Sequence, residues 1–229
     1  MDVKLLEEKE DSIKVLIKDT NIAFVNALRR QIMNGVPVLA VEDIHIYENN
    51  GVMFDEMLAS RIGLIPLKMD LKTYKSGDKV KLILEKEGPC TVYSKDIKST
   101  DPKIEVAKMN IPITKLGEGQ KIKLEMDAVV GSGKEHAKWQ PAIASYIEVP
   151  KIVGGKGKSY KADIIEMILD EKQRDIPLDS DQKLEYDPNS FIFVIESHGN
   201  LTPKELFNAA TGELTNKAKE FIGELKNLS

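Results

Sequence analysis

The sequence predicts an α+β fold in which the two ends of the chain build one discontinuous unit around an inserted, mostly β segment. Helical periodicity occurs near both ends of the chain, over residues 22–34 and 203–227. Between these helices, short strand-like runs alternate with Gly, Pro and Asp clusters from residue 68 to residue 149. The 229 residues suffice for one large domain or two small ones.

The composition is that of a protein that works through other proteins. The net charge is −4 and the pI about 5.6, whereas stand-alone nucleic-acid-binding proteins usually carry a basic excess. No apolar run approaches the roughly 20 residues that span a bilayer, and the acidic start MDVKLLEEKEDS predicts no signal peptide. The single cysteine, Cys90, excludes an intramolecular disulfide, and we expect a cytoplasmic protein.

The first expected elements are a hairpin and an amphipathic helix. Residues 3–17 read as two strands around the polar turn EEKEDS. Asp19 or Thr20 can cap the helix over 22–34, which ends at Asn34-Gly35. One broad face of this helix is apolar and consists of Ile22, Val25, Leu28, Ile32 and Met33.

Two arginines lie on this helix in unusual places. Arg29 falls inside the apolar face, and Arg30 lies just beyond it, beside Asn26. A guanidinium is rarely buried without a partner. The partner is either a group of the same chain, such as Glu42, or a carboxylate across an interface, where arginine is enriched.

The middle of the chain reads as strands around one short helix. Residues 38–48 turn to period two and end at the turn Asn49-Asn50-Gly51. Asp55 is expected to cap a helix over 56–65, which stops at Pro66. The strand-like runs that follow are 79–87, 90–97, 103–107, 121–130 and 142–149.

The last third contains a loop, a short helix, a buried strand and a long helix. Residues 150–162 are loop-like, and residues 163–173 predict a short helix. FIFVIES, residues 191–197, predicts a buried central strand. Thr202, Pro203 and Glu205 occupy the N-cap, N1 and N3 positions of a capping box, which opens the helix over 203–227.

The long helix carries a continuous apolar row. Its members recur every three or four residues and are Phe207, Ala210, Leu214, Ala218, Phe221 and Leu225. At 1.5 Å per residue the helix is roughly 37 Å long. Such a helix either lies across the whole domain or packs against a partner.

No pattern of catalytic or metal-binding residues is present. His45, His136 and His198 each lack a second ligand at helical spacing, and no Cys-x-x-Cys pair exists. GGKGKS, residues 154–159, ends like a phosphate-binding loop, but Ile152 stands where its first glycine is required. We therefore expect no catalytic residue, cofactor or metal.

Three segments resemble the α-type subunits of cellular RNA polymerases. They are NALRRQIMNGVPVLAVEDIHIYENNGVMFDEMLASRIGLIPL (26–67), GSGKEHAKWQPA (131–142) and FIFVIESHGNLTPKELFNAA (191–210). They lie in the family's order and span most of the chain. The second segment is similar to the archaeal and eukaryotic branch of the family.

The resemblance implies a domain plan. Residues 1–43 and 185–229 would form a dimerisation domain, and residues 44–150 an inserted β-rich domain. Residues 151–184 would connect them, at the place where some relatives carry cysteine-ligated iron–sulfur clusters. This stretch contains no cysteine, so its cluster ligands are missing.

The resemblance also implies partners. The chain would pair with a smaller α-like chain, subunit L, and recruit the small subunits N and P and the two large catalytic subunits. Catalysis would reside in those large chains, DNA would be contacted only through the complex, and no membrane would be involved. The chain would thus be a non-catalytic part of a nucleotidyltransferase complex.

Interface residues follow from the same motifs. We expect Asn26, Arg29 and Arg30 to face other polymerase chains, together with the apolar row of the last helix. Further candidates on the family pattern are Asp55, Glu56, Arg61, His136 and Trp139. For Asp55 and Arg61 a structural role within the chain is the alternative, and for Trp139 a core position. A homodimeric α+β binding module unrelated to transcription is the alternative function.

Overall fold

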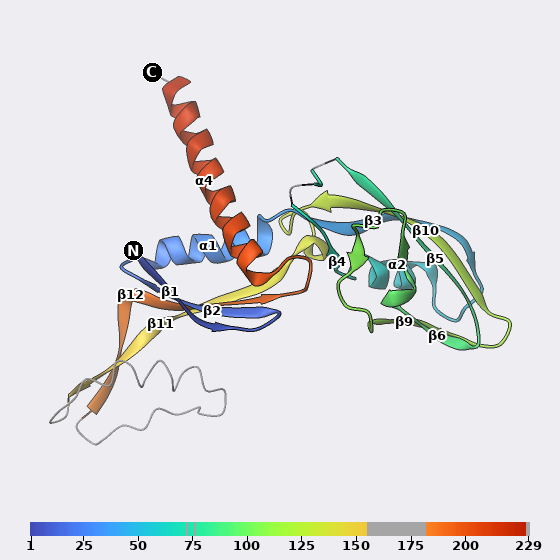
Figure 1. Cartoon of the computed structure of the whole chain (residues 1–229), viewed down its shortest axis with the longest axis horizontal. Helices are drawn as coiled ribbons and strands as arrows, with labels where there is room; N and C mark the ends of the chain where they lie inside the picture. Colours follow the sequence, from blue (N-terminus) through green and yellow to red (C-terminus); the bar gives the residue numbers. More distant parts are fainter. Residues whose placement is uncertain (72, 76, 155–181, 228–229) are drawn as a thin grey trace.

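The structure is a computed structural model that describes residues 1–71, 73–75, 77–154 and 182–227. Two lobes lie side by side (Figure 1). Both ends of the chain build the terminal lobe, which contains β1 (Asp2–Glu8), β2 (Ser12–Lys18), α1 (Ile22–Asn34), β11 (Ala142–Gly154), β12 (Gln182–Ser197) and α4 (Pro203–Asn227). The α+β class and the union of the two chain ends are therefore confirmed.

The terminal lobe is an antiparallel sheet with α1 and α4 against one face. Its strand order is β1-β2-β12-β11. The expected hairpin is β1 and β2, and FIFVIES is part of β12 at an interior position of the sheet. Phe191 and Phe193 of β12 are fully buried, and Phe207 of α4 packs edge-on against Phe193 at 6.2 Å between ring centroids. The helices thus cover the aromatic side of the sheet.

The inserted lobe extends from residue 38 to residue 139. Its elements are β3 (Val38–Asn49), α2 (Asp55–Gly63), β4 (Leu67–Lys68), β5 (Lys79–Glu87), β6 (Cys90–Tyr93), η1 (Ser94–Asp96), β7 (Lys98–Ser99), β8 (Glu105–Val106), β9 (Pro112–Leu116), β10 (Lys121–Gly131) and η2 (Ala137–Trp139). One sheet has the order β3-β10-β5-β7, and β4-β8 and β6-β9 form two short pairs. Helix α2 packs against β3 and β9.

The strand at residue 142 differs from the expectation. We placed AIASYIEV in the inserted β-rich segment, but β11 pairs with β12 in the terminal sheet. Strand β11 also continues through Gly154, so residues 150–154 are strand and the loop predicted there is wrong. Local alternation identifies a strand but not its neighbour, which depends on the whole fold. The helix predicted over 163–173 lies outside the described residues.

The predicted caps of α1 and α2 are wrong. Helix α1 is capped by Asn21, whose Oδ1 accepts a hydrogen bond from Phe24 N at 2.9 Å. Asp19 instead adopts a positive φ of 53°, and Thr20 N bonds to Asn189 O. Asp55 is the first residue of α2, and its Oδ1 accepts a hydrogen bond from Asn49 Nδ2 at 2.6 Å.

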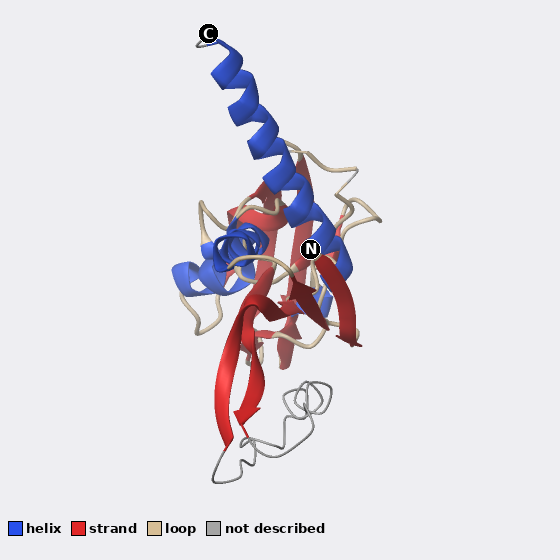
Figure 2. Cartoon of the chain, turned by 90° about the vertical axis from the view of Figure 1, so that its left-hand side faces the viewer, coloured by secondary structure: helices blue, strands red, loops and turns tan. Residues whose placement is uncertain are grey.

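Helix α4 has the predicted length but leaves the body of the protein. Its capping box forms as expected, since Thr202 N donates to Glu205 Oε2 at 2.9 Å and Glu205 N to Thr202 Oγ1 at 3.3 Å. Only its first turns lie against the terminal lobe, and the remainder projects beyond it (Figure 2). The helix therefore does not lie across the whole domain.

Candidate subunit interface

The two arginines of α1 have different surroundings. Arg29 is half-buried, with Nε and Nη2 both 3.2 Å from Asn26 Oδ1 and Nη1 3.5 Å from Met33 Sδ. The suggested pairing of Arg29 with Glu42 is wrong, because Glu42 forms its ion pair with Lys138. Arg30 is exposed and has no side-chain hydrogen bond or ion pair within the described residues. The first arginine is thus held by its own helix, and the second is available to another group.

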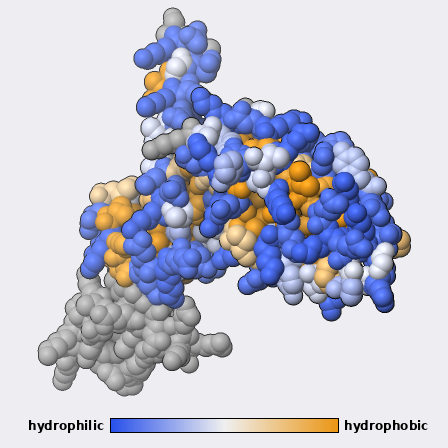
Figure 3. Space-filling model, turned by 45° about the vertical axis from the view of Figure 1, so that its right-hand side comes forward, coloured by the Kyte–Doolittle hydropathy of each residue, from blue (hydrophilic) through white to orange (hydrophobic). Residues whose placement is uncertain are grey.

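The apolar row of α4 divides into two halves. Phe207 and Leu214 are half-buried and Ala210 is fully buried against the lobe. Beyond residue 215 the helix has no buried residue among those described, and Phe221 is 66% and Leu225 48% exposed. The projecting end is mostly hydrophilic, with a small hydrophobic spot (Figure 3). The first half holds the helix in place, and the second half is free to contact a partner.

A second exposed apolar surface lies at the start of the chain, and we did not predict it. Val3 is 52% and Leu5 45% exposed on the edge strand β1. Their partners in β2 are the inward-facing Ile17 and Val15, so they lie on the side of the sheet that carries the helices. At the start of α1, Ile22 and Phe24 are 52% and 36% exposed. Of these four residues, only Ile22 was named from the sequence, as a member of the apolar face of the first helix.

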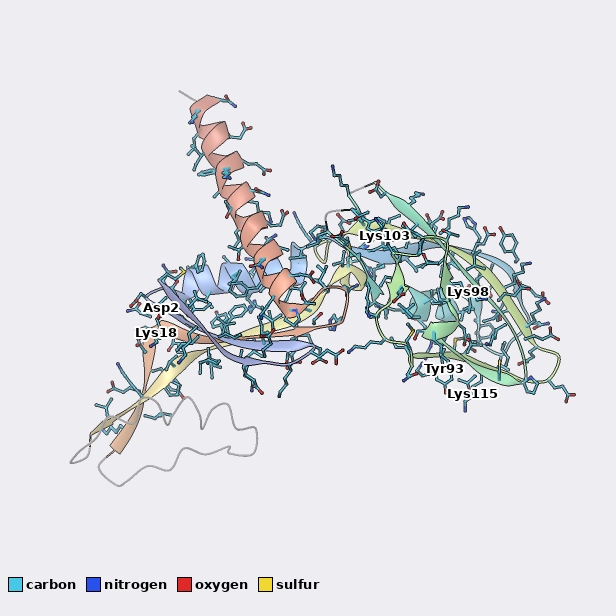
Figure 4. The ribbon with its side chains drawn as sticks, in the orientation of Figure 1. Asp2, Lys18, Tyr93, Lys98, Lys103 and Lys115 are labelled. Atoms are coloured by element: carbon cyan, nitrogen blue, oxygen red, sulfur yellow. The ribbon has the colours of Figure 1, made fainter. Side chains whose placement is uncertain are left out.

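The α2 candidates lie beside a groove of about 590 Å³. Arg61 crosses to β9, where Nε is 2.9 Å from Ile113 O and an Nη is 2.6 Å from Pro112 O. Glu56 is exposed. One wall of the groove is formed by Val52, Phe54 and Met57, and Lys115 lies on the β6-β9 pair that forms the other wall (Figure 4). Arg61 therefore links α2 to β9 within the chain, as the structural alternative has it, while the partner contacts of this region stay a prediction.

The last two candidates, His136 and Trp139, lie in and beside η2 and differ in exposure. Trp139 is only 6% exposed, and its Nε1 donates to Val129 O at 3.1 Å. A Cβ on Gly131 would stand 2.4 Å from the indole, so glycine makes room for the ring. His136 is exposed and its Nδ1 accepts from Lys138 N at 3.1 Å. Trp139 is therefore a core residue of this chain, and His136 remains at the surface.

Neither a metal cluster nor a membrane-spanning helix occurs in the part of the chain that the structure describes. No group of three or more His, Cys, Asp or Glu side chains is placed to hold an ion among these residues. None of the described helices is both long enough and apolar enough to cross a bilayer. What the described surface offers is a set of exposed apolar and cationic side chains around α1 and α4.

Known proteins are similar in sequence to nearly the whole of this chain. The profile of the RNA polymerase Rpb3/RpoA insert domain matches residues 44–149. The DNA-directed RNA polymerase subunit Rpo3 of Pyrococcus furiosus is 37% identical, over 100% of this chain and 98% of its own length. The Rpo3 subunits of Methanocaldococcus jannaschii and Natronomonas pharaonis are 39% and 34% identical, over 90% and 96% of this chain and 86% and 95% of their own lengths.

A two-lobed chain that joins its ends in one sheet and carries this insert domain is an α-type RNA polymerase subunit. Within that class, the chain belongs to the family of archaeal DNA-directed RNA polymerase subunits called Rpo3. It is accordingly part of a polymerase complex, and the resemblance found in the sequence is confirmed.

Proposed function

We propose that this chain is the non-catalytic assembly platform of an archaeal-type RNA polymerase in the cytoplasm. It pairs with a smaller α-like chain, subunit L, through α1 and α4. The pair then docks the small subunits N and P and the two large catalytic subunits. Catalysis and DNA contact belong to the complex, and this chain supplies the geometry on which the complex is built.

The exposed end of α4 is the observation that carries the proposal. A helix that projects from its lobe with Phe221, Ile222 and Leu225 at 66%, 53% and 48% exposure leaves apolar area in water. Burying such side chains contributes about 1.5–3 kcal/mol each when the burial is complete. Val3, Leu5 and Phe24 add a second apolar surface on the side of the sheet that carries the helices. A partner helix that lies beside α4 covers the first set. A part of the partner that lies against the start of α1 covers the second.

A related partner fits this layout by symmetry. In an isologous pair, each chain contributes the same patch, so α4 of each chain lies beside a helix of the other. A smaller α-like chain with the same two helices supplies both halves of such a contact. A second copy of this chain would do the same, and this is the homodimer alternative.

We propose further that the chain binds no iron–sulfur cluster. A cluster is held by several cysteine thiolates, and the sequence contains one cysteine, Cys90. Cys90 begins β6 in the inserted lobe, and its Sγ lies 3.5 Å from Glu87 O. Iron and acid-labile sulfide analysis of the purified complex, with this chain separated from the others, tests this statement.

Purification of the tagged chain from its native cells tests the platform role. We expect the eluate to contain two very large polymerase chains, an α-like chain of roughly 10 kDa in one-to-one ratio, and run-off transcription activity. Recovery of the chain with only itself and without activity would establish the homodimeric binding module instead.

A further inference from the structure

A pocket of about 380 Å³ lies where α1, α4 and the loop after β10 meet. Helices α1 and α4 belong to the terminal lobe, whereas the loop belongs to the inserted lobe, so both lobes contribute to the pocket. The lining residues that matter here are Arg30, Gln31, Asn34, Gly35, Lys134 and Lys217.

The pocket is cationic and lacks a counter-charge. Arg30, Lys134 and Lys217 line it, and none of the described residues that line it is acidic. The ammonium of Lys217 donates to the neutral Gln31 Oε1 at 2.8 Å. None of the three cations forms an ion pair in the described part of the chain, although the chain as a whole has a net charge of −4. Three cations that converge without a carboxylate repel one another and favour an incoming anion.

An unpaired buried amide is the independent observation. Gln31 is 6% exposed, and its Nε2 has no hydrogen-bond acceptor among the residues that the structure describes. Buried donors in folded proteins are almost always paired, because an unpaired one loses its water without compensation. Nε2 lies against Gly35, where an added Cβ would stand 1.8 Å from it. The donor thus lies just beneath the lining of the cationic pocket and has no acceptor in the part of the chain that the structure describes.

We propose that this pocket binds the carboxylate of an aspartate or glutamate side chain of another polymerase chain. The carboxylate accepts from the ammonium of Lys217, and from Gln31 Nε2 once the amide turns away from Gly35, while Lys134 and Arg30 supply further positive charge. A carboxylate accepts two hydrogen bonds side by side, and hydrogen bonds to charged groups are the stronger kind. The proposal rests on the platform role and adds the chemistry of one contact to it.

The contribution of the inserted lobe to the pocket assigns the carboxylate to a chain other than the α-like partner. The apolar residues assigned to that partner all belong to the terminal lobe, although Phe221 of α4 lies only one helical turn beyond Lys217. Lys134, by contrast, brings the inserted lobe into the pocket. A chain that reaches this carboxylate site contacts both lobes at once, as we propose for the large subunits.

Charge reversal at the two lysines tests the proposal in two steps. The variant carries Lys134→Glu and Lys217→Glu, both at exposed positions, and Lys219→Glu on the same helix but outside the pocket is the matched control. First, each chain is mixed with the α-like subunit and the one-to-one complex is measured. Second, the tagged complex captures the large subunits at low and high salt.

We expect the double variant to form the heterodimer like the control and to capture at least about tenfold less of the large subunits at low salt. Equal capture by the double variant and the control would overturn the carboxylate site, while the platform role would stand. Failure of the unaltered chain to form a heterodimer would overturn the platform role itself. Thermal unfolding of each variant confirms that the chain remains folded.

A photocrosslinking residue at position 134, Lys134→p-benzoylphenylalanine, identifies the occupant in the assembled polymerase. Crosslinks to an acidic segment of a large chain support the assignment. Crosslinks to the α-like subunit overturn the choice of chain, and crosslinks to nucleic acid show that the pocket takes a phosphate instead.

Discussion

Arg29 and Arg30 point in different directions from α1, because successive residues of a helix are rotated by about 100° around its axis. Arg29 is half-buried and bonded to Asn26 and Met33, three and four residues away on the same helix. Arg30 is exposed and lines the cationic pocket. The fold therefore uses the first side chain to cover an apolar edge and leaves the second exposed, where we propose that it meets an external carboxylate. We expect neither to carry much of the stability of the isolated chain.

Replacing these arginines tests that division. Pairs at three or four residues on a helix surface contribute about 0.2–0.5 kcal/mol, so we expect Arg29→Ala to lower the free energy of unfolding by no more than about 0.5 kcal/mol. Arg30→Ala should change it even less. At least one of the two should lower recovery of assembled polymerase in a pull-down. A loss of several kcal/mol in denaturant unfolding would show that the arginine serves the fold of this chain.

His198 provides a residue-scale test in pH. Burial lowers the pKa of this imidazole below 6.5, Lys108 adds to the effect, and Glu196 opposes it. Since the neutral form is favoured in the fold, its contribution to stability is present above about pH 6.5 and is lost as the pH falls through the lowered pKa. His198→Gln should therefore lose less free energy of unfolding than the unaltered chain between about pH 7.5 and about pH 5.5. Equal losses in both chains would exclude His198 as a source of acid sensitivity.

At the scale of elements, α4 combines a structural half and an exposed half. Phe221→Ser with Leu225→Ser changes only exposed side chains, so the free energy of unfolding of the isolated chain should stay within about 0.5 kcal/mol. Pairing with the α-like subunit should weaken by at least about tenfold, because two apolar anchors are removed. Leu206→Ala, at a fully buried position of the same helix, should instead cost about 2–5 kcal/mol. Analytical ultracentrifugation and urea unfolding measure the two effects separately, and unchanged pairing would remove α4 from the interface.

The apolar periodicity of the sequence predicts where helices and strands lie better than it predicts which groups cap them or pair with them. The bounds of α1 and α4 follow from apolar spacing together with the end signal Asn34-Gly35 and the capping box that begins at Thr202. The cap of α1 does not follow, because Asp19, Thr20 and Asn21 are all good caps. Only the fold chooses Asn21, since Asp19 takes a φ of 53° and Thr20 N bonds to Asn189 O. The sequence also does not predict which strand pairs with β11, because a strand with alternating apolar residues can pair with several others.

The candidate interface shows the same limit. The apolar row of α4 was predicted as one continuous surface. Which of its residues are buried depends on how far the terminal lobe extends along the helix. Val3 and Leu5 carry no local signal, since an edge strand and an interior strand alternate alike. Gln31 reads as an ordinary polar residue of a helix, and its missing acceptor becomes apparent only after Gly35 and Lys217 are placed around it.

At the scale of the whole molecule, the two lobes share one hydrophobic core and are tied by a buried asparagine. A connected set of buried side chains extends from Ile13 in the terminal sheet to Leu84 in the inserted sheet. Asn200, 4% exposed in the turn after β12, donates from Nδ2 to Leu67 O at 3.0 Å, and its carbonyl accepts from Met69 N at 3.3 Å. A platform that docks chains on both lobes requires a fixed angle between them, and this residue spans the junction.

Asn200→Ala tests whether that junction holds the lobes together. The change leaves a buried carbonyl without this donor, so we expect the free energy of unfolding to fall by about 1–3 kcal/mol. Amide hydrogen exchange at Met69 should accelerate, because its acceptor, the backbone carbonyl of residue 200, is no longer held in place by the side-chain bond to Leu67 O. Asn208→Ala, at an exposed position of α4, is the matched control and should change neither quantity. If stability falls but large-subunit capture by the heterodimer does not, the lobe angle is set by the shared core alone. If both fall, the asparagine also preserves the geometry on which assembly depends.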